Sequence, residues 1–273
     1  MNRSKAGTAY DLTGPADAPV LALVHGLGLT RSTWDDFVPV LSRDYRVLAY
    51  DLCGHGQSAL PQVKPSLTAL SDQLAHLMDD LKIDLAAIIG FSLGGMINRR
   101  FALDHPSRVT ALVILNSPHE RGPKAQRLVK ERAAQTTVGG PAATIDSTLQ
   151  RWFTPQFLTG SPDVVARVRA TVLANDPESY AGHRQVLASG VTELIRPDPP
   201  VTAPTLVMTC AHDSGSTPAM SHAIAAEIAG AECVIVPGLQ HLGLIERPDL
   251  FTAEIRGFLA RSASHIQMNG PKA

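Results

Sequence analysis

Six short apolar runs, rich in β-branched residues and bounded by Gly, Pro, Asp or Asn, constrain the fold more than any other feature of the chain. Continuous runs of this kind are typical of strands buried on both faces of a parallel sheet. Segments with a helical period lie between them, and the clearest has its apolar stripe at Leu67, Leu70, Leu74, Met78 and Leu81. This alternation predicts an α/β fold with a mostly parallel central sheet and helices on both faces. The runs cover residues 20–24, 46–50, 86–90, 111–116, 205–210 and 232–237.

The alternation breaks between residues 120 and 196, where no buried-strand run occurs and the composition becomes helical, polar and rich in Arg, Thr and Pro. Strand-helix alternation resumes at Thr205, so the outer segments are expected to complete one sheet. We therefore predict that residues 1–119 and 197–273 form a core domain, and that residues 120–196 form a helical cap over one edge of its sheet.

The composition is that of an ordinary globular protein. Lys plus Arg total 24 against 25 Asp plus Glu, and 44% of the 273 residues are hydrophobic. This balance argues against a disordered chain and against a nucleic-acid-binding protein. No apolar run approaches the roughly 18 residues of a membrane span, and residues 1–9 lack the apolar stretch of a secretory signal. Three widely spaced cysteines suggest no disulfide framework. We expect a cytoplasmic protein that does not act at a membrane.

Residues 90–94, Gly-Phe-Ser-Leu-Gly, match the G-x-S-x-G motif between a predicted strand and a predicted helix. In this setting a sharp, strained turn lifts the serine hydroxyl above the sheet, and flanking glycines let the neighbouring backbones approach closely. A chance match in a Gly-rich turn is the alternative, but the strand and helix on either side favour a nucleophile. Ser92 is therefore the candidate nucleophile.

A serine nucleophile requires a histidine base and a carboxylate that orients it, and in this setting they follow the serine in the order Asp, His. Asp213 follows the predicted strand 205–210, and His241 follows the last predicted strand through a short turn. A turn-forming aspartate is the alternative for Asp213, with Asp51 and the region of Asn116 as other candidates. Position favours His241 over the other nine histidines, which lie in glycine-rich loops, helices, the predicted cap or the polar tail.

Acyl transfer also needs hydrogen-bond donors aimed at the developing oxyanion. The loop His-Gly-Leu-Gly at residues 25–28 follows the first predicted core strand, so the backbone N–H of Leu27 is expected to meet that of Leu93. A phosphate-binding role for this loop is disfavoured, because it has neither a third glycine at dinucleotide spacing nor a Gly-Lys-Ser or Gly-Lys-Thr sequence.

These motifs together resemble the α/β-hydrolases over almost the whole chain. The resemblance implies the α/β-hydrolase fold with a helical cap insertion. Residues 91–97 and the cap segment 151–157 look most like the 3-oxoadipate enol-lactonase branch, whose members open a small lactone carrying a carboxylate. Three departures concern the substrate rather than the triad: Cys53 stands where that branch usually has Arg, His25-Gly26 looks more like general carboxylesterases, and Ala211 replaces a common glycine. The matching segments are residues 25–28, 51–58, 90–95, Asp213, His241 and 246–248.

The cap is expected to select the substrate, because it covers a catalytic edge made of strand-end loops. By resemblance, Trp152 lines the pocket and contacts the substrate; the alternative is that it only anchors cap helices to the core. A basic stripe is typical of a solvated helix face, with steering of an anionic substrate as the alternative. It consists of Arg121, Lys124, Arg127 and Lys130.

The sequence therefore predicts a cofactor-free serine hydrolase that cleaves a small carboxylic ester or lactone through an acyl-enzyme, with Ser92, His241 and Asp213 as its triad. No group of His, Cys or carboxylate residues has the spacing of a metal site, so no metal is expected. A C–C bond hydrolase of aromatic ring-cleavage products and a non-catalytic binding module on the same fold are the alternatives. The sequence predicts no oligomeric state.

Overall fold

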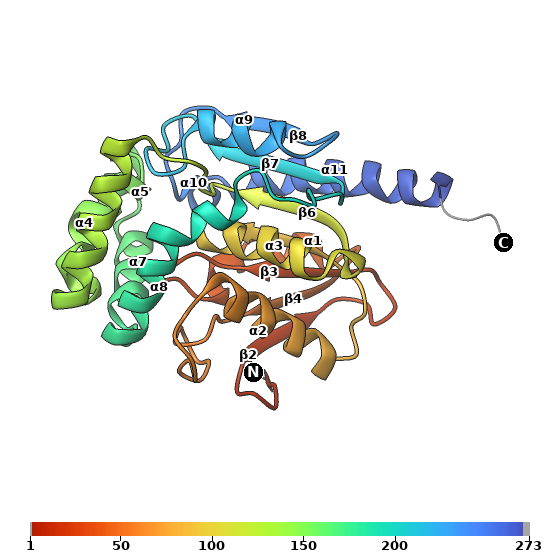
Figure 1. Ribbon diagram of the computed structural model, residues 1–273, viewed down its shortest axis with the longest axis horizontal. Coiled ribbons are helices and arrows are strands. Elements are labelled where there is room, and N and C mark those ends of the chain that lie inside the picture. The colour runs from red at the N-terminus through yellow and green to blue at the C-terminus, as the bar shows by residue number, and fades with distance from the viewer. Residues whose placement is uncertain (1, 270–273) are drawn as a thin grey trace.

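The computed structural model describes residues 2–269 and contains an eight-stranded sheet of order β1-β2-β4-β3-β5-β6-β7-β8 (Figure 1). Strands β3 to β8 run parallel to one another, which confirms the predicted α/β architecture. All six predicted runs are strands. The strands are β1 (Asn2–Arg3), β2 (Ala9–Thr13), β3 (Val20–Val24), β4 (Arg46–Tyr50), β5 (Ala86–Phe91), β6 (Val109–Leu115), β7 (Thr205–Cys210) and β8 (Glu232–Val236).

Strands β1 and β2 at one edge were not predicted, and they are antiparallel. Strand β2 alternates polar and apolar residues. It pairs with β4 in a register that places Tyr10 opposite Tyr50. The residues of β1 are exposed and those of β2 are mostly half-buried, so neither strand has the continuous apolar run that marked the central strands.

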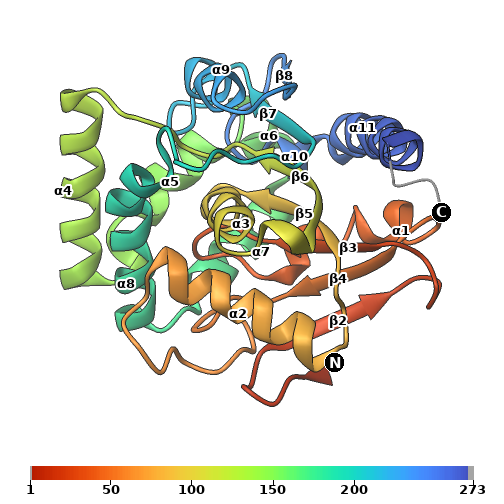
Figure 2. The ribbon, with the colours of Figure 1, turned by 45° about the vertical axis from the view of Figure 1, so that its right-hand side comes forward.

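Helices cover both faces of the sheet. Helices α2 (Leu67–Asp80) and α3 (Leu93–Asp104) pack against each other on one face, and α1 (Val38–Leu41) and α11 (Pro248–Asn269) lie on the other (Figure 2). Helix α9 (Pro218–Ala226) packs on β7 and β8, and α10 (Gly243–Glu246) precedes α11. Within the described residues, no helix combines the length and the apolar character that crossing a bilayer requires.

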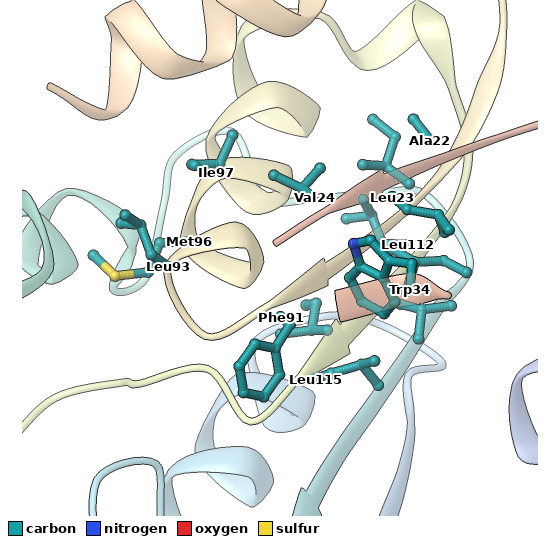
Figure 3. Packing of buried hydrophobic residues seen from close by; sticks show 14 of the residues in the cluster. Ala22, Leu23, Val24, Trp34, Phe91, Leu93, Met96, Ile97, Leu112 and Leu115 are labelled. Carbon is teal, nitrogen blue, oxygen red and sulfur yellow. The ribbon is translucent and has the colours of Figure 1, made fainter. Parts of the chain in front are cut away.

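The core lies where these helices meet the central strands. Every residue of β5 and β7 is buried, as expected for strands covered on both faces. Figure 3 shows apolar side chains of β3, including Leu23 and Val24, gathered with Met96 and Ile97 of helix α3 around the sheet. This packing holds the ends of β3, β5, β7 and β8 in a fixed arrangement, and the candidate site lies at those ends.

Five α-helices and no strand lie between residues 120 and 196, and Figure 1 shows helices α4, α5, α7 and α8 of this segment gathered at the end of the sheet toward which the parallel strands point. Four of the five begin with Pro at their first position, which is a favoured start of a helix. The division into 1–119, 120–196 and 197–273 stays a prediction, and residues 1 and 270–273 lie outside the described chain. The helices are α4 (Pro123–Gly139), α5 (Ile145–Trp152), α6 (Pro155–Gly160), α7 (Pro162–Leu173) and α8 (Pro177–Ser189).

Candidate active site

Ser92 sits on the sharp turn between β5 and α3 that the motif predicts. Its backbone is strained, with φ 56° and ψ −110°, a conformation that side-chain-bearing residues rarely adopt. The turn needs its glycines, because a Cβ at Gly90 would lie 2.2 Å from the carbonyl oxygen of Gly94 and a Cβ at Gly94 would lie 2.1 Å from that of Val24. The strain therefore serves to present the hydroxyl at the end of the sheet.

The structure brings Ser92, His241 and Asp213 into one hydrogen-bonded chain. The Oγ of Ser92 lies 3.1 Å from Nε2 of His241, and Nδ1 of His241 lies 2.6 Å from Oδ2 of Asp213. All three are buried, with exposed fractions of 6%, 9% and 2%. Asp213 follows β7 and His241 follows β8, so the parallel topology places both at the same edge of the sheet as Ser92. With the proton on Nδ1, the imidazole donates to the carboxylate and accepts from the hydroxyl.

Asp213 is held as a carboxylate by several donors. Its Oδ1 accepts from the backbone N–H groups of Gly215 and Ser216, and its Oδ2 accepts from Nδ2 of Asn116 at 2.9 Å. Burial by itself raises the pKa of Asp213, but the attraction of His241 and these hydrogen bonds outweigh it and lower the pKa. The carboxylate of Asp213 is therefore ionised, and its Oδ2 is oriented toward Nδ1 of His241.

Asn116 was expected only as an alternative place for the acid, and the structure shows it donating to the acid. It directly follows β6 and has a positive φ of 46°, which Asn tolerates better than most residues. Its amide also bonds the hydroxyl of Thr209 on β7. The sequence indicated only a polar residue at the end of a buried strand. Asn116 can donate to Asp213 because β6 lies next to β7.

Leu27 and Leu93 present free backbone N–H groups at the site. Within residues 2–269, neither amide donates a hydrogen bond to a protein acceptor. The loop of Leu27 approaches the nucleophile closely, since a Cβ added at Gly26 would lie 3.3 Å from Cβ of Ser92. Leu27 lines the pocket, Leu93 directly follows Ser92, and the side chains of both leucines are buried. The arrangement suits two donors to an oxyanion.

The competing residues named from the sequence lie elsewhere. Asp51 is fully buried and pairs with Arg31, while its carboxylate also accepts from the backbone N–H of Gln57. His25 accepts from the backbone N–H of Leu52, and its burial lowers its pKa to about 4. These contacts support the loops beside the site and leave His241 as the histidine that faces Ser92.

A pocket opens above Ser92 between the strand ends and the helical segment 120–196. Trp152 lines it, is 7% exposed, and has its ring centroid 6.0 Å from that of His241. Its position is fixed by the backbone N–H of Leu242, which donates to its carbonyl at 2.8 Å, and by Glu246, which accepts from both the N–H and the hydroxyl of Thr154. Trp152 thus both lines the pocket and joins the core.

Four arginines also line this pocket: Arg121, Arg132, Arg151 and Arg184. The basic stripe that includes Arg121 was predicted to be a solvated helix face. For Arg121 that prediction is wrong. Arg121 precedes α4 and turns into the pocket, whereas Lys124, Arg127 and Lys130 are exposed on that helix. The other pocket arginines gave no such signal, because residues 132, 151 and 184 are distant in sequence and belong to three helices.

No group of His, Cys or carboxylate side chains within residues 2–269 is arranged to hold a metal ion. The three cysteines are free thiols, and burial raises the pKa of Cys53 to about 11 and that of Cys210 to about 12. Neither thiol is therefore a ready nucleophile near neutral pH.

The chain is similar to known hydrolases over almost its whole length. It is 28% identical over 259 residues to 3-oxoadipate enol-lactonase 2 of Acinetobacter baylyi, and the alignment covers 92% of each chain. The crystal structure of the enol-lactonase from Burkholderia xenovorans LB400 shares 32% identity and a TM-score of 0.85, covering 93% of this chain and 96% of that one. A malate-bound thermophilic esterase from Thermogutta terrifontis shares 26% identity and a TM-score of 0.83, covering 93% of both.

The alpha/beta hydrolase fold family matches residues 19–248, a range that includes Ser92, Asp213 and His241. The sheet order, the strained serine turn and the placement of the three residues after β5, β7 and β8 agree with that match. The resemblance expected from the motifs is thereby confirmed, and this chain belongs to the α/β-hydrolases.

Proposed function

We propose that the protein is a serine hydrolase that cleaves a small carboxylic ester or lactone through an acyl-enzyme. The observation that carries the proposal is the buried hydrogen-bonded chain from Ser92 Oγ through His241 to Asp213. Near Ser92 lie the backbone N–H groups of Leu27 and Leu93, which have no acceptor within residues 2–269. A nucleophile, a base, an orienting carboxylate and oxyanion donors in one pocket are the parts that acyl transfer requires.

In the first half-reaction His241 takes the proton of Ser92 while Oγ attacks the acyl carbonyl. Asp213 holds the imidazole in the tautomer that accepts at Nε2 and stabilises the imidazolium that forms. The amides of Leu27 and Leu93 donate to the tetrahedral oxyanion. The imidazolium then protonates the leaving alkoxide, the C–O bond breaks, and the acyl group remains on Ser92.

In the second half-reaction His241 removes a proton from water, which attacks the acyl-enzyme. The second tetrahedral intermediate collapses, Ser92 recovers its proton from the imidazolium, and the carboxylic acid leaves. For a lactone the alcohol and the acid are parts of one product. No cofactor or metal takes part in this scheme.

The substrate class follows from the pocket and from the relatives. Two of the similar proteins are named enol-lactonases and a third is named an esterase. The helical segment 120–196 acts as the cap that selects among such substrates, and Trp152 supplies a flat apolar wall beside His241. A small-molecule ester or lactone, processed in the cytoplasm, is the proposed substrate.

The test is a screen of the purified protein against short p-nitrophenyl esters and small lactones. Replacing Ser92 by Ala should lower kcat by roughly four to six orders of magnitude while the folded circular-dichroism spectrum is kept. Ser107→Ala, at an exposed serine outside the pocket, is the matched control and should retain full activity. Near wild-type turnover by Ser92→Ala would overturn the proposal.

Covalent labelling separates the two alternatives named from the sequence. A fluorophosphonate should modify Ser92, as shown by peptide mass spectrometry, because its hydroxyl is activated by His241. A binding module with an inert serine would show neither labelling nor turnover. Labelling without hydrolysis of esters or lactones, together with cleavage of a dienoate diketone, would identify a C–C bond hydrolase instead.

A further inference from the structure

The pocket above Ser92 carries an unusual concentration of positive charge. Its four arginines come from different parts of the helical segment: Arg121 precedes α4, Arg132 lies on α4, Arg151 on α5 and Arg184 on α8. Arg121, Arg132 and Arg184 come together because α4 packs against α8, and α5 brings Arg151 to the same pocket. The charge is therefore a product of the tertiary arrangement, and it faces the nucleophile.

These guanidinium groups have almost no anionic partner. Within residues 2–269, Arg132 and Arg184 form neither an ion pair nor a side-chain hydrogen bond, although Arg184 is only 7% exposed. Arg151 donates only to the neutral oxygens of Ser147 and Thr148. The Nε and Nη1 atoms of Arg121 are buried without any acceptor. The carboxylate of the pocket, Asp213, is already engaged by His241.

The free protein holds this arrangement at an energetic cost. Burial, together with repulsion from Arg184, lowers the pKa of Arg121 to about 10. Burial and the neighbouring Arg132 and Arg184 lower the pKa of Arg151 to about 10 as well. Elsewhere in the molecule, arginines such as Arg31 and Arg100 are paired with carboxylates. Buried charges in proteins are normally paired. Arg184 is buried and the other three arginines are half-buried, and within residues 2–269 none of the four forms an ion pair with a carboxylate. This absence at a binding site indicates that the partner is the ligand.

We infer that the substrate of this site carries two carboxylates in addition to the ester or lactone carbonyl that Ser92 attacks. The inference rests on the proposed function and specifies its substrate class. One carboxylate accepts two parallel hydrogen bonds from a guanidinium and is readily shared by two of them. Two carboxylates therefore match four arginines, whereas a single one would leave buried positive charge uncompensated.

The hydrolysis is compatible with this charge balance. Attack by Ser92 and then by water converts the carbonyl into a third carboxylate, which forms at Ser92 in the pocket that also contains His241 and Asp213. Repulsion between this new anion and Asp213 would favour release of the product. The arginines would hold the two spectator carboxylates during both half-reactions and position the scissile carbonyl over the Leu27 and Leu93 amides.

Binding to the wild-type enzyme tests the inference without any catalytic step. Isothermal titration calorimetry at constant ionic strength compares pentanoate with glutarate, which have the same chain length and carry one and two carboxylates. Glutarate should bind with about ten- to hundred-fold lower Kd, because it makes a second set of charge-assisted hydrogen bonds. Equal affinity for the two acids would overturn the inference, and so would inorganic phosphate binding more tightly than glutarate.

Two arginines of the same helix provide a matched pair of variants. Arg132→Gln should raise the Kd of glutarate about ten-fold or more, whereas Arg127→Gln should leave it unchanged, because Arg127 is exposed and lies outside the pocket. Arg184→Gln should behave like Arg132→Gln. Thermal unfolding of each variant shows whether the fold is kept, and a loss of affinity in Arg127→Gln equal to that in Arg132→Gln would contradict a specific site.

Kinetics then separate the inference from the proposed function. A γ-lactone with two carboxylates should be hydrolysed with about hundred-fold higher kcat/KM than the uncharged ring, and Arg184→Gln should lower that ratio about ten-fold. Serine-dependent hydrolysis of both lactones at equal rates would overturn the inference and leave the hydrolase standing. Tight glutarate binding without turnover of any ester or lactone would overturn the proposed function and leave the anion site standing.

Discussion

Two groups of buried charged side chains meet in one pocket and are stabilised in opposite ways. Asp213 is 2% exposed and accepts hydrogen bonds from donors in four residues, namely Asn116, Gly215, Ser216 and His241. Arg184 is 7% exposed, and its side chain has no hydrogen bond or ion pair within residues 2–269. The negative charge of Asp213 is thus compensated by donors of the protein, at the ends of strands packed in the core. The positive charge of Arg184, in the helical segment, has no such partner among the described residues.

This difference separates chemistry from recognition. A reaction centre must keep the same geometry through each turnover, so its carboxylate is fixed by permanent protein donors. A specificity pocket gains binding energy when its charged groups lack protein partners, because the ligand then satisfies them. The unpaired arginines destabilise the free protein, which is a common cost of a binding site.

The largest effect is expected when the carboxylate of Asp213, whose charge the protein compensates, is removed. Asp213→Asn keeps the shape of the side chain but favours the wrong imidazole tautomer, so kcat on a p-nitrophenyl ester should fall about 10⁴-fold. Steady-state kinetics measure this loss, and a folded variant with wild-type kcat would show that Asp213 does not orient His241.

A third buried cluster consists of histidines whose protonated form is disfavoured by burial, so protonation is expected to destabilise the fold. His25 and His55 have ring centroids 5.4 Å apart, and those of His55 and His183 are 4.7 Å apart. Burial lowers the pKa of His25 to about 4 and also lowers the pKa values of His55 and His183. His183 belongs to α8, so the cluster joins the helical segment to the loops of the sheet.

The unfolded chain binds these protons near pH 6.5 and the folded protein only at lower pH, so the free energy of unfolding should fall as the pH drops from 7 toward 4. Each histidine contributes up to about 1.4 kcal/mol per pH unit in this window. Urea unfolding at pH 7, 6 and 5 measures the slope. His183→Gln should reduce it, and the exposed His76→Gln should not; equal slopes in both variants would contradict this origin.

A smaller effect is expected when the partnered carboxylate loses one donor. Asn116→Gly tolerates the positive φ of 46° but removes the amide that donates to Asp213. Because Asp213 keeps its bonds from Gly215, Ser216 and His241, kcat should fall only about ten-fold, the equivalent of one charged hydrogen bond. A loss as large as that of Asp213→Asn would make Asn116 indispensable rather than supporting.

The smallest expected effect is a gain in stability when one of the arginines without a carboxylate partner is removed. Arg184→Met removes a buried charge that has no protein partner and keeps much of the apolar volume, so the free energy of unfolding should rise by about 1 kcal/mol. Urea unfolding measures it, with the exposed Arg127→Met as control. A marked loss of stability would mean that Arg184 has a structural role and would weaken the contrast with Asp213.

The central strands and the candidate triad could be predicted because their signals are local. Buried strands are continuous apolar runs, and Ser92 lies in a motif of consecutive residues, 90–94, between a predicted strand and a predicted helix. Strand β2 escaped prediction because its residues are mostly half-buried and form no continuous apolar run. Asn116 was noticed at a strand end, but nothing in its neighbourhood in sequence indicates that it donates to a residue 97 positions away.

The sequence by itself determined the strand-helix order, the serine turn and the order in which Asp213 and His241 follow it, since each depends on residues close together in the chain. The tertiary structure decided which charges are compensated. The sequence does not distinguish the exposed Arg127 from the arginines of the pocket, and only the arrangement of α4, α5 and α8 brings those four to the pocket that contains Ser92. They are Arg121, Arg132, Arg151 and Arg184. Burial and distance set the energy of a charge, and neither is a property of the residue alone.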